Sequence, residues 1–169
     1  MRTLENFNRN GDLPITAGIF NAKLIAAEAH GSQMYGDLPY TEHLLDVFAY
    51  GNHIWENWDD TCSQAAFLHD IIEDTPTTED DLREMGFSEE VIAIVVLVTK
   101  RKNLDYFENI QYIIDSENVR AMMVKAADNL ANLRGDKSHW DETRAMKSNA
   151  KYQASFEVLV EAATNLGAK

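Results

Sequence analysis

The chain has 169 residues, 45% of them hydrophobic and 25% charged, a composition typical of a soluble globular protein, so we expect residues 1–169 to form a single domain. Its 28 acidic and 15 basic residues give a formal net charge of −13, which disfavours binding to nucleic-acid polymers and anionic membranes but permits a small anionic substrate. The longest apolar run, Val91–Val98, is too short to cross a bilayer. The polar N-terminal segment and the single Cys62, which we expect to be a small buried side chain, favour a cytoplasmic protein.

The spacing of apolar residues is helical along nearly the whole chain. Together with the positions of proline and glycine, it predicts helices over about residues 19–29, 39–51, 61–73, 77–86, 88–98, 105–114, 118–133 and 141–166. The β-branched run Val91–Val98 would also suit a buried strand. We predict a helix there because Ser88 is a good N-cap, Glu89 and Glu90 favour the positive end of a helix dipole, and no partner strand is predicted. The expected fold is an all-α helical bundle.

Two adjacent polar residues, His69 and Asp70, lie near the end of the third predicted helix, whose other face is apolar. Burying both without partners would be costly, whereas a divalent metal ion binds a neutral imidazole and an ionised carboxylate together. Two ligands make a weak site, so further ligands must come from other helices. His43 and Asp128 fit, because each lies on a predicted helix among apolar neighbours. This mixed nitrogen and oxygen set suits Mn, Fe or Zn and is poorly matched to Cu(I) or Ca.

A second acidic pair follows the first within one helical turn. Glu73 comes four residues after His69, and Asp74 comes four residues after Asp70, so we expect each carboxylate to extend the same helical face. Such a pair is suited to orienting a metal-bound water or accepting its proton. Asn132 stands four residues beyond Asp128 and is expected to hydrogen-bond on the same face.

Four separated fragments carry these residues: PYTEH, LHDIIEDT, VTK and KAADNLANL. In this order and over about His30 to Arg134, they resemble the HD-domain metal-dependent phosphohydrolases, and among these the hydrolase domain of the RelA/SpoT type, whose small stand-alone members have a similar length. A lone HD doublet is weak evidence, but HDxxEDT with both outlying fragments in order is specific.

The resemblance implies an HD-type helical bundle and removal of pyrophosphate from the 3′ position of guanosine tetra- or pentaphosphate. It implies that Glu73 and Asp74 act on the nucleophilic water and that Asn132 helps to place the substrate. It also implies a divalent cofactor, manganese, with four ligands: His43, His69, Asp70 and Asp128.

One departure from the family pattern concerns the base. The family often has an arginine that packs against the guanine ring, and this chain has Tyr35 in its place, after His30 and Gln33. A tyrosine can stack on a base but brings no charge. The candidate cations for substrate phosphates are Lys100, Arg101, Lys125, Arg134 and Arg144, of which Lys100, Lys125 and Arg144 join Tyr35 and Asn132 in the expected substrate-binding set.

Two alternatives remain open at this point. The enzyme acts on another nucleotide, such as a deoxynucleotide or the 2′-phosphate of NADPH, or the chain is a non-catalytic sensor that binds nucleotide or metal. The Glu73–Asp74 pair counts against a sensor, which needs no water-activating group. Other prominent side chains are expected to be structural, namely His53, His139, Met122, Met123, Trp55 and Trp58, while substrate-side packing stays open for His30. The oligomeric state is not predicted.

Overall fold

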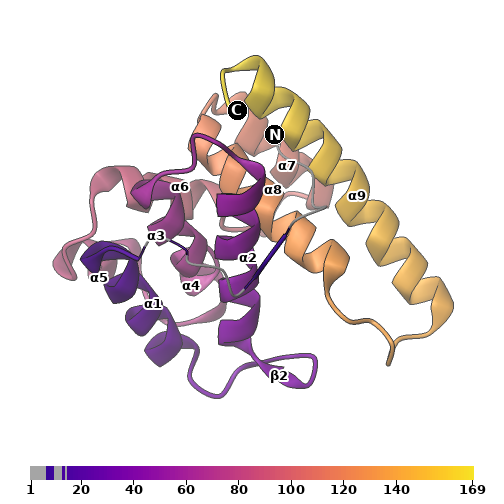
Figure 1. The fold of residues 1–169 in the computed structure, drawn as a ribbon, viewed down its shortest axis with the longest axis horizontal. Coiled ribbons are helices and arrows are strands. Elements are labelled where there is room, and N and C mark those ends of the chain that lie inside the picture. Colours follow the sequence, from indigo (N-terminus) through magenta and orange to yellow (C-terminus); the bar gives the residue numbers. More distant parts are fainter. Residues whose placement is uncertain (1–6, 10–12, 14) are drawn as a thin grey trace.

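The computed structural model describes residues 7–9, 13 and 15–169 as a mostly helical single domain (Figure 1). In chain order the helices are α1 (Ala17–His30), α2 (Tyr40–Ile54), α3 (Asp60–Leu68), α4 (Ile71–Asp74), α5 (Glu79–Glu84), α6 (Glu89–Val98), α7 (Tyr106–Asp115), α8 (Val119–Arg134) and α9 (Glu142–Asn165). The expected helical fold class is confirmed. In the described part of the chain, no helix has both the length and the apolar character required to span a membrane.

The helix starts follow the capping residues seen in the sequence. The Ser88 hydroxyl accepts a hydrogen bond from the Val91 amide, and the apolar run that follows is α6, as predicted. Thr78 and Asp81 form a capping box at α5, in which each side chain accepts a hydrogen bond from the other residue's backbone amide. Local sequence therefore determines where these helices begin.

The segment between α1 and α2 departs from the all-helical expectation. Strands β1 (Met34–Tyr35) and β2 (Leu38–Pro39) form a short antiparallel pair with Met34 opposite Pro39 and Tyr35 opposite Leu38. Gly36 lies in the turn with a φ of 59°, a left-handed conformation that glycine adopts without steric cost. The predicted break is thus a small hairpin, and it presents Tyr35 to the start of α2.

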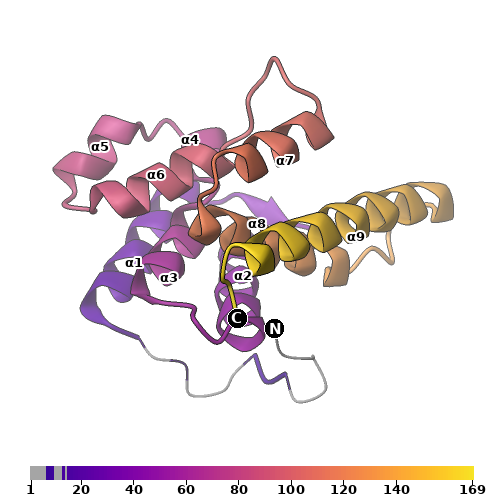
Figure 2. The same ribbon diagram turned by 90° about the horizontal axis from the view of Figure 1, so that it is seen from above.

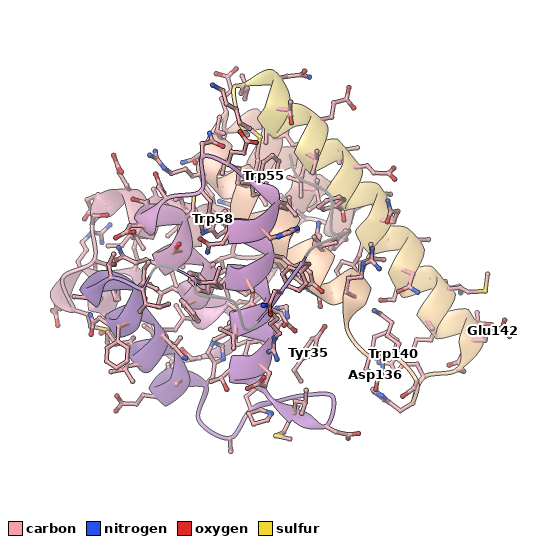
Figure 3. The ribbon with its side chains drawn as sticks, in the orientation of Figure 1. Tyr35, Trp55, Trp58, Asp136, Trp140 and Glu142 are labelled. Atoms are coloured by element: carbon pink, nitrogen blue, oxygen red, sulfur yellow. The ribbon has the colours of Figure 1, made fainter. Side chains whose placement is uncertain are left out.

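The predicted end of the second helix at Gly51 is wrong. Helix α2 continues to Ile54, and Gly51 is a buried interior residue. A Cβ atom at Gly51 would lie 2.2 Å from the Trp58 ring, so the glycine makes room for the indole. Trp55 and Trp58 lie just beyond this end of α2 (Figure 3). Glycine at position 51 therefore allows the contact with Trp58 and does not end the helix.

The predicted third helix is two helices, not one. Helix α3 ends at Leu68 and α4 begins at Ile71, while Asp70 between them has φ −104° and ψ 2°, outside the helical region. His69 and Asp70 therefore occupy a bend. Glu73 and Asp74 belong to the short helix after it and do not continue a single helical face.

Helix α8 forms the centre of the core. It packs against α2 on one side and runs beside α9 on the other (Figure 2). Small side chains on α8 allow this close approach, and four of them are fully or almost fully buried: Ala121, Ala126, Ala127 and Ala131. Met122, Met123, Trp55 and Cys62 are buried as expected. A metal ligand on α8 is therefore held by the most enclosed element of the fold.

Candidate metal centre and active-site pocket

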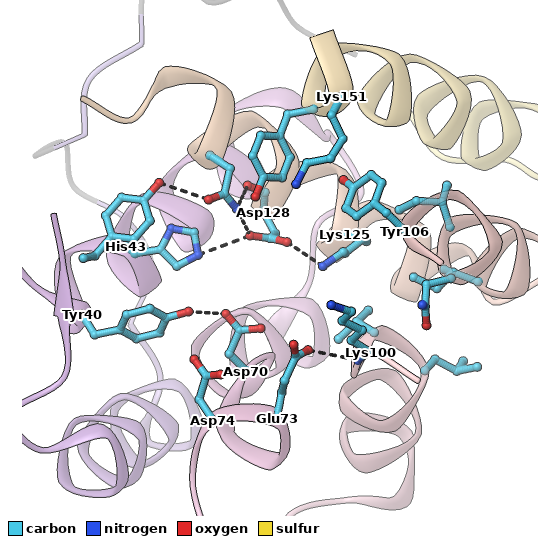
Figure 4. Close-up of a pocket in the computed structure, with 18 residues that line it drawn as sticks. Tyr40, His43, Asp70, Glu73, Asp74, Lys100, Tyr106, Lys125, Asp128 and Lys151 are labelled. Atoms are coloured by element: carbon cyan, nitrogen blue, oxygen red, sulfur yellow. Dashed lines mark hydrogen bonds and ion pairs between the residues drawn. The ribbon is translucent and has the colours of Figure 1, made fainter. Parts of the chain in front are cut away.

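The four predicted metal ligands lie together in the core. His43 on α2 and Asp128 on α8 approach to 3.2 Å between Nε2 and Oδ1, and His69 Nε2 lies 3.6 Å from the same oxygen. Asp70 Oδ2 is 2.9 Å from His69 Nε2. One ligand atom each from His43, His69 and Asp70 fall within 4.8 Å of one another. Four side chains from three separate parts of the chain thus converge, and Figure 4 shows three of them, His43, Asp70 and Asp128.

The orientation of His69 suits a metal ligand. Its Nδ1 donates a hydrogen bond to the Ala66 carbonyl at 2.8 Å, which leaves Nε2 facing Asp70 and Asp128. That Nε2 is buried and has no hydrogen-bond partner among the described residues, although Asp70 and Asp128 lie close to it. A neutral Nε2 that faces two carboxylates is unfavourable unless a cation, either a proton or a metal ion, lies between them. The donor set therefore fits a divalent metal ion.

The charges around this centre are strongly coupled. When no metal ion is bound, burial opposes ionisation of His69, but Asp70 and Asp128 outweigh it and raise the imidazole pKa to about 10, so a metal ion that binds Nε2 takes the place of a proton there. Burial likewise opposes the charge on Asp128, yet Lys125 and the two imidazoles hold the pKa of this carboxyl well below its usual range. Both carboxylates are therefore ionised and require a positive partner, a role that a bound cation fills.

Other side chains hold the ligands in place. Lys125 Nζ donates a hydrogen bond to Asp128 Oδ2 at 2.8 Å, and the Tyr40 hydroxyl donates one to Asp70 Oδ2. Asn132 Nδ2 donates to Asp128 Oδ1 at 2.6 Å, the neighbour relation expected from their spacing on a regular helix. Tyr35 donates to Asn132 Oδ1 at 3.1 Å.

Tyr35 also contacts the centre directly through its ring. The ring stacks on His43 with centroids 4.6 Å apart and an interplanar angle of 25°. Together with its bond to Asn132, this contact places Tyr35 beside two of the residues predicted to act at the site. Tyr35 lines two cavities, the one at this centre and another that is also lined by Arg134 and Trp140.

Glu73 and Asp74 lie at the exposed rim of the same cavity, which has a volume of about 320 Å³. Glu73 Oε2 accepts a hydrogen bond from the Lys100 backbone amide at 3.0 Å. Asp74 Oδ2 accepts one from Gln33 Nε2 at 2.7 Å, and Gln33 Oε1 lies 2.8 Å from Nδ1 of the buried His30. Each carboxylate is thus oriented by a different segment of the chain.

The predicted cations have different positions. Lys100 and Lys125 line the cavity, whereas Arg144 lies over the Trp140 ring at 4.1 Å and is not one of the described residues around this cavity. Arg101 lies over the Tyr112 ring, and Arg134 lines the second cavity. Arg144 therefore has no contact here that supports its predicted role.

Sequence reasoning missed nine of the residues that line this cavity, four of which have a tyrosine or lysine side chain. Tyr40 is part of the PYTEH fragment, so its position beside a ligand was a usable signal. Tyr106, Lys151 and Tyr152 come from α7 and α9 and reach the cavity only through tertiary packing. No motif or spacing in the sequence distinguishes them.

The part of the chain that carries these residues also matches known proteins. The family described as "HD domain" matches residues 40–133. The chain is 35% identical over 139 residues to guanosine-3′,5′-bis(diphosphate) 3′-pyrophosphohydrolase MESH1 of Xenopus tropicalis, covering 76% of this chain and 77% of the relative. It is 37% identical over 125 residues to the protein of the same name from Danio rerio, covering 70% and 69%. GTP pyrophosphokinase rsh of Brucella ovis is 36% identical over 67% of this chain, which corresponds to only 16% of that longer protein.

A solved structure shares the fold. It is described as a metazoan ortholog of SpoT that hydrolyzes ppGpp and plays a role in starvation responses, and it superposes with a TM-score of 0.70 over 91% of this chain and 96% of its own. At 24% identity this match concerns the fold alone. The family match, the similarity to MESH1 and the buried His/Asp centre agree, and the chain belongs to the HD domain family of metal-dependent phosphohydrolases.

Proposed function

We propose that this protein is a metal-dependent hydrolase that removes pyrophosphate from the 3′ position of guanosine 3′,5′-bis(diphosphate). The observation that carries the proposal is the centre formed by the buried His43, His69 and Asp128 with the partly exposed Asp70, at the base of a cavity with two carboxylates on its rim. The printed activity of the MESH1 relatives supports the substrate. We further propose that residues 1–169 act as one domain in the cytoplasm.

The four residues would hold one divalent cation, which we propose to be Mn²⁺, the metal that the family resemblance implies and one of those that suit the mixed set of imidazole nitrogen and carboxylate oxygen. When bound, such an ion lowers the pKa of a coordinated water and screens phosphate charge. Lys125, paired with Asp128, and Tyr40, bonded to Asp70, keep the two carboxylates ionised and fixed. The chain therefore supplies a prearranged site that needs little reorganisation on binding.

Glu73 and Asp74 are proposed to handle the proton of the attacking water. Their carboxylates are exposed to the cavity and accept hydrogen bonds from Lys100 and Gln33, which fix their orientation while leaving oxygen lone pairs free. The water oxygen bonds to the phosphorus attached to the 3′ oxygen, the bond from that phosphorus to the ribose oxygen breaks, and pyrophosphate leaves. The ribose oxygen takes up a proton, so the products are pyrophosphate and guanosine 5′-diphosphate.

The remaining proposed roles concern substrate placement. Lys100 and Lys125 offer positive charge to the phosphates along one side of the cavity. Lys125 binds one carboxylate oxygen of Asp128, and Asn132, itself bound by Tyr35, binds the other. We propose that Asn132 and Tyr35 contact the nucleoside. Arg144 remains a proposed phosphate contact only if the Trp140 segment moves toward the cavity on binding.

The test is to incubate purified protein with Mn²⁺ and guanosine 3′,5′-bis(diphosphate) and to measure released pyrophosphate. We expect release, and we expect Glu73→Gln to lower kcat at least about a hundredfold while the bound metal, measured by elemental analysis, is retained. No pyrophosphate, together with cleavage of another nucleotide in a panel, would refute the substrate. Full activity in Glu73→Gln would refute the role of this carboxylate.

Tyr35 is the observation that favours a second candidate substrate. It stacks on His43 and brings no charge, so the requirement for guanine is weaker here than with an arginine. The same panel, extended to deoxynucleotides and NADPH, decides between the candidates. Cleavage of guanosine 3′,5′-bis(diphosphate) alone would eliminate the second one.

A further inference from the structure

Lys151 on α9 occupies an unusual position in the cavity wall. Its ammonium nitrogen lies 4.5 Å from the centroid of the Tyr106 ring and 4.2 Å from that of Tyr152. It lines the same cavity as Lys100 and Lys125, and Figure 4 shows it reaching in from α9 with Tyr106 nearby. This side chain therefore brings a third positive charge to the proposed substrate site.

The charge on Lys151 has no acidic partner. Lys125 is paired with Asp128 at 2.8 Å, but no described carboxylate lies within ion-pair distance of Lys151. Burial, together with the charges of Lys125 and Lys100, lowers the pKa of its ammonium. Four carboxylates line the same cavity (Asp70, Glu73, Asp74 and Asp128), but none of them pairs with Lys151, so its ammonium is available to an anion that enters the cavity.

The rings that flank Lys151 are fixed to the fold. The Tyr106 hydroxyl lies 2.8 Å from Ser155 Oγ and 3.1 Å from Asn129 Oδ1, and both of these partners are completely buried. Cation–π contact with two rings directs the ammonium without neutralising it. The geometry is that of a prearranged anion-binding group rather than of a loosely solvated lysine.

Lys151 is also separate from the reacting groups. Lys125 binds Asp128, and the backbone amide of Lys100 binds Glu73, so both belong to the end of the cavity where cleavage is proposed. The Lys151 ammonium lies over two tyrosine rings and forms no ion pair with a described carboxylate. A substrate with phosphates at two positions would place one at the metal centre and bring the other within reach of a different cation.

We propose that Lys151 binds the phosphate group of the substrate that is not cleaved, so that it selects nucleotides carrying phosphates on both the 3′ and the 5′ oxygens. For guanosine 3′,5′-bis(diphosphate) this group is the 5′-diphosphate. The inference rests on the proposed function. It makes Lys151 a specificity-determining residue with no part in the bond-breaking step.

The test compares Lys151→Met with the unmodified protein on two substrates, guanosine 3′,5′-bis(diphosphate) and the analogue with a free 5′-hydroxyl. A charge-assisted contact predicts a loss of about tenfold to a hundredfold in kcat/KM for the first, expressed mainly in KM, and an unchanged value for the analogue. Lys151→Arg keeps the charge and should retain more activity than Lys151→Met. Lys147→Met, an exposed position one turn earlier on α9, is the matched control and should change neither substrate.

Binding of the intact nucleotide supplies a readout independent of turnover. In the Glu73→Gln background, calorimetry should give a Kd at least about tenfold weaker when Lys151→Met is added. Equal losses on both substrates, or no loss on either, would overturn the inference, and circular dichroism of each variant excludes misfolding. If the unmodified protein releases no pyrophosphate from guanosine 3′,5′-bis(diphosphate), the proposed function fails. If it is active but Lys151→Met changes nothing, only the inference about Lys151 fails.

Discussion

Gly135 allows the close approach of Tyr35 to the site. It follows α8 with φ −58° and ψ 149°, values open to any L-amino acid, so an alanine would introduce no backbone strain. Its Cβ would lie 2.6 Å from the Tyr35 hydroxyl oxygen and 3.4 Å from the nearest ring atom. Gly135→Ala therefore forces the hydroxyl to withdraw by about 0.8 Å to reach an ordinary contact distance.

The expected cost follows from the bond that this shift disrupts. Tyr35 donates to Asn132, which in turn donates to Asp128, and a hydrogen bond of this kind contributes about 1 kcal/mol. We expect Gly135→Ala to lower the free energy of unfolding by about 1 kcal/mol, or about 2–4 °C in Tm for a chain of this size. The same energy lost from substrate placement would reduce kcat/KM by about fivefold.

A double-mutant cycle isolates this cause. In a Tyr35→Phe background the clashing oxygen is absent, so Gly135→Ala should cost nothing further in Tm or in kcat/KM. Thermal unfolding followed by circular dichroism and steady-state pyrophosphate release measure the four proteins. An equal penalty in both backgrounds would refute the reasoning, because it would show that the alanine acts through something other than the tyrosine hydroxyl.

Three further variants or treatments have definite expected outcomes. Gly51→Ala should lower the free energy of unfolding by about 1–2 kcal/mol, because its Cβ would lie 2.2 Å from the Trp58 ring and the strain exceeds the gain in helix propensity; a higher Tm would contradict this. Gln33→Leu removes the donor to Asp74 and should reduce kcat about twofold to tenfold with metal content unchanged, so a loss of metal would point to a different role. Burial raises the pKa of the Cys62 thiol to about 12, so a thiol reagent should label it only after unfolding in guanidinium, and rapid labelling of the native protein would show that the site is open.

The parts of the site that could be predicted from the sequence are those fixed by contiguous motifs or by a regular helix. Asp128 and Asn132 are hydrogen-bonded as their four-residue spacing predicts, because α8 is uninterrupted. His43, His69 and Asp70 converge as expected from the cost of burying them singly. Local patterns were therefore sufficient for the ligand set and for the Asp128–Asn132 pair on α8.

The failures arose where tertiary contacts override local rules. Gly51 resembled a helix stop, but its function is to admit Trp58 from outside the helix. Glu73 was assigned to a continuous helix that in fact bends at Asp70. Lys151 lines the cavity only because α9 packs along α8, and the spacing of residues along the sequence does not predict this packing.

The location of the metal centre has a consequence for the amount of protein that survives in a cell. His43 and Asp128 lie on α2 and α8, the packed helices at the middle of the fold, and both side chains are almost completely buried. An ion that binds only the folded chain adds stability in proportion to the logarithm of its concentration, about 2.7 kcal/mol at one hundred times its dissociation constant. Metal starvation would thus act twice, first by silencing the enzyme and then by exposing more of its unfolded form to proteases.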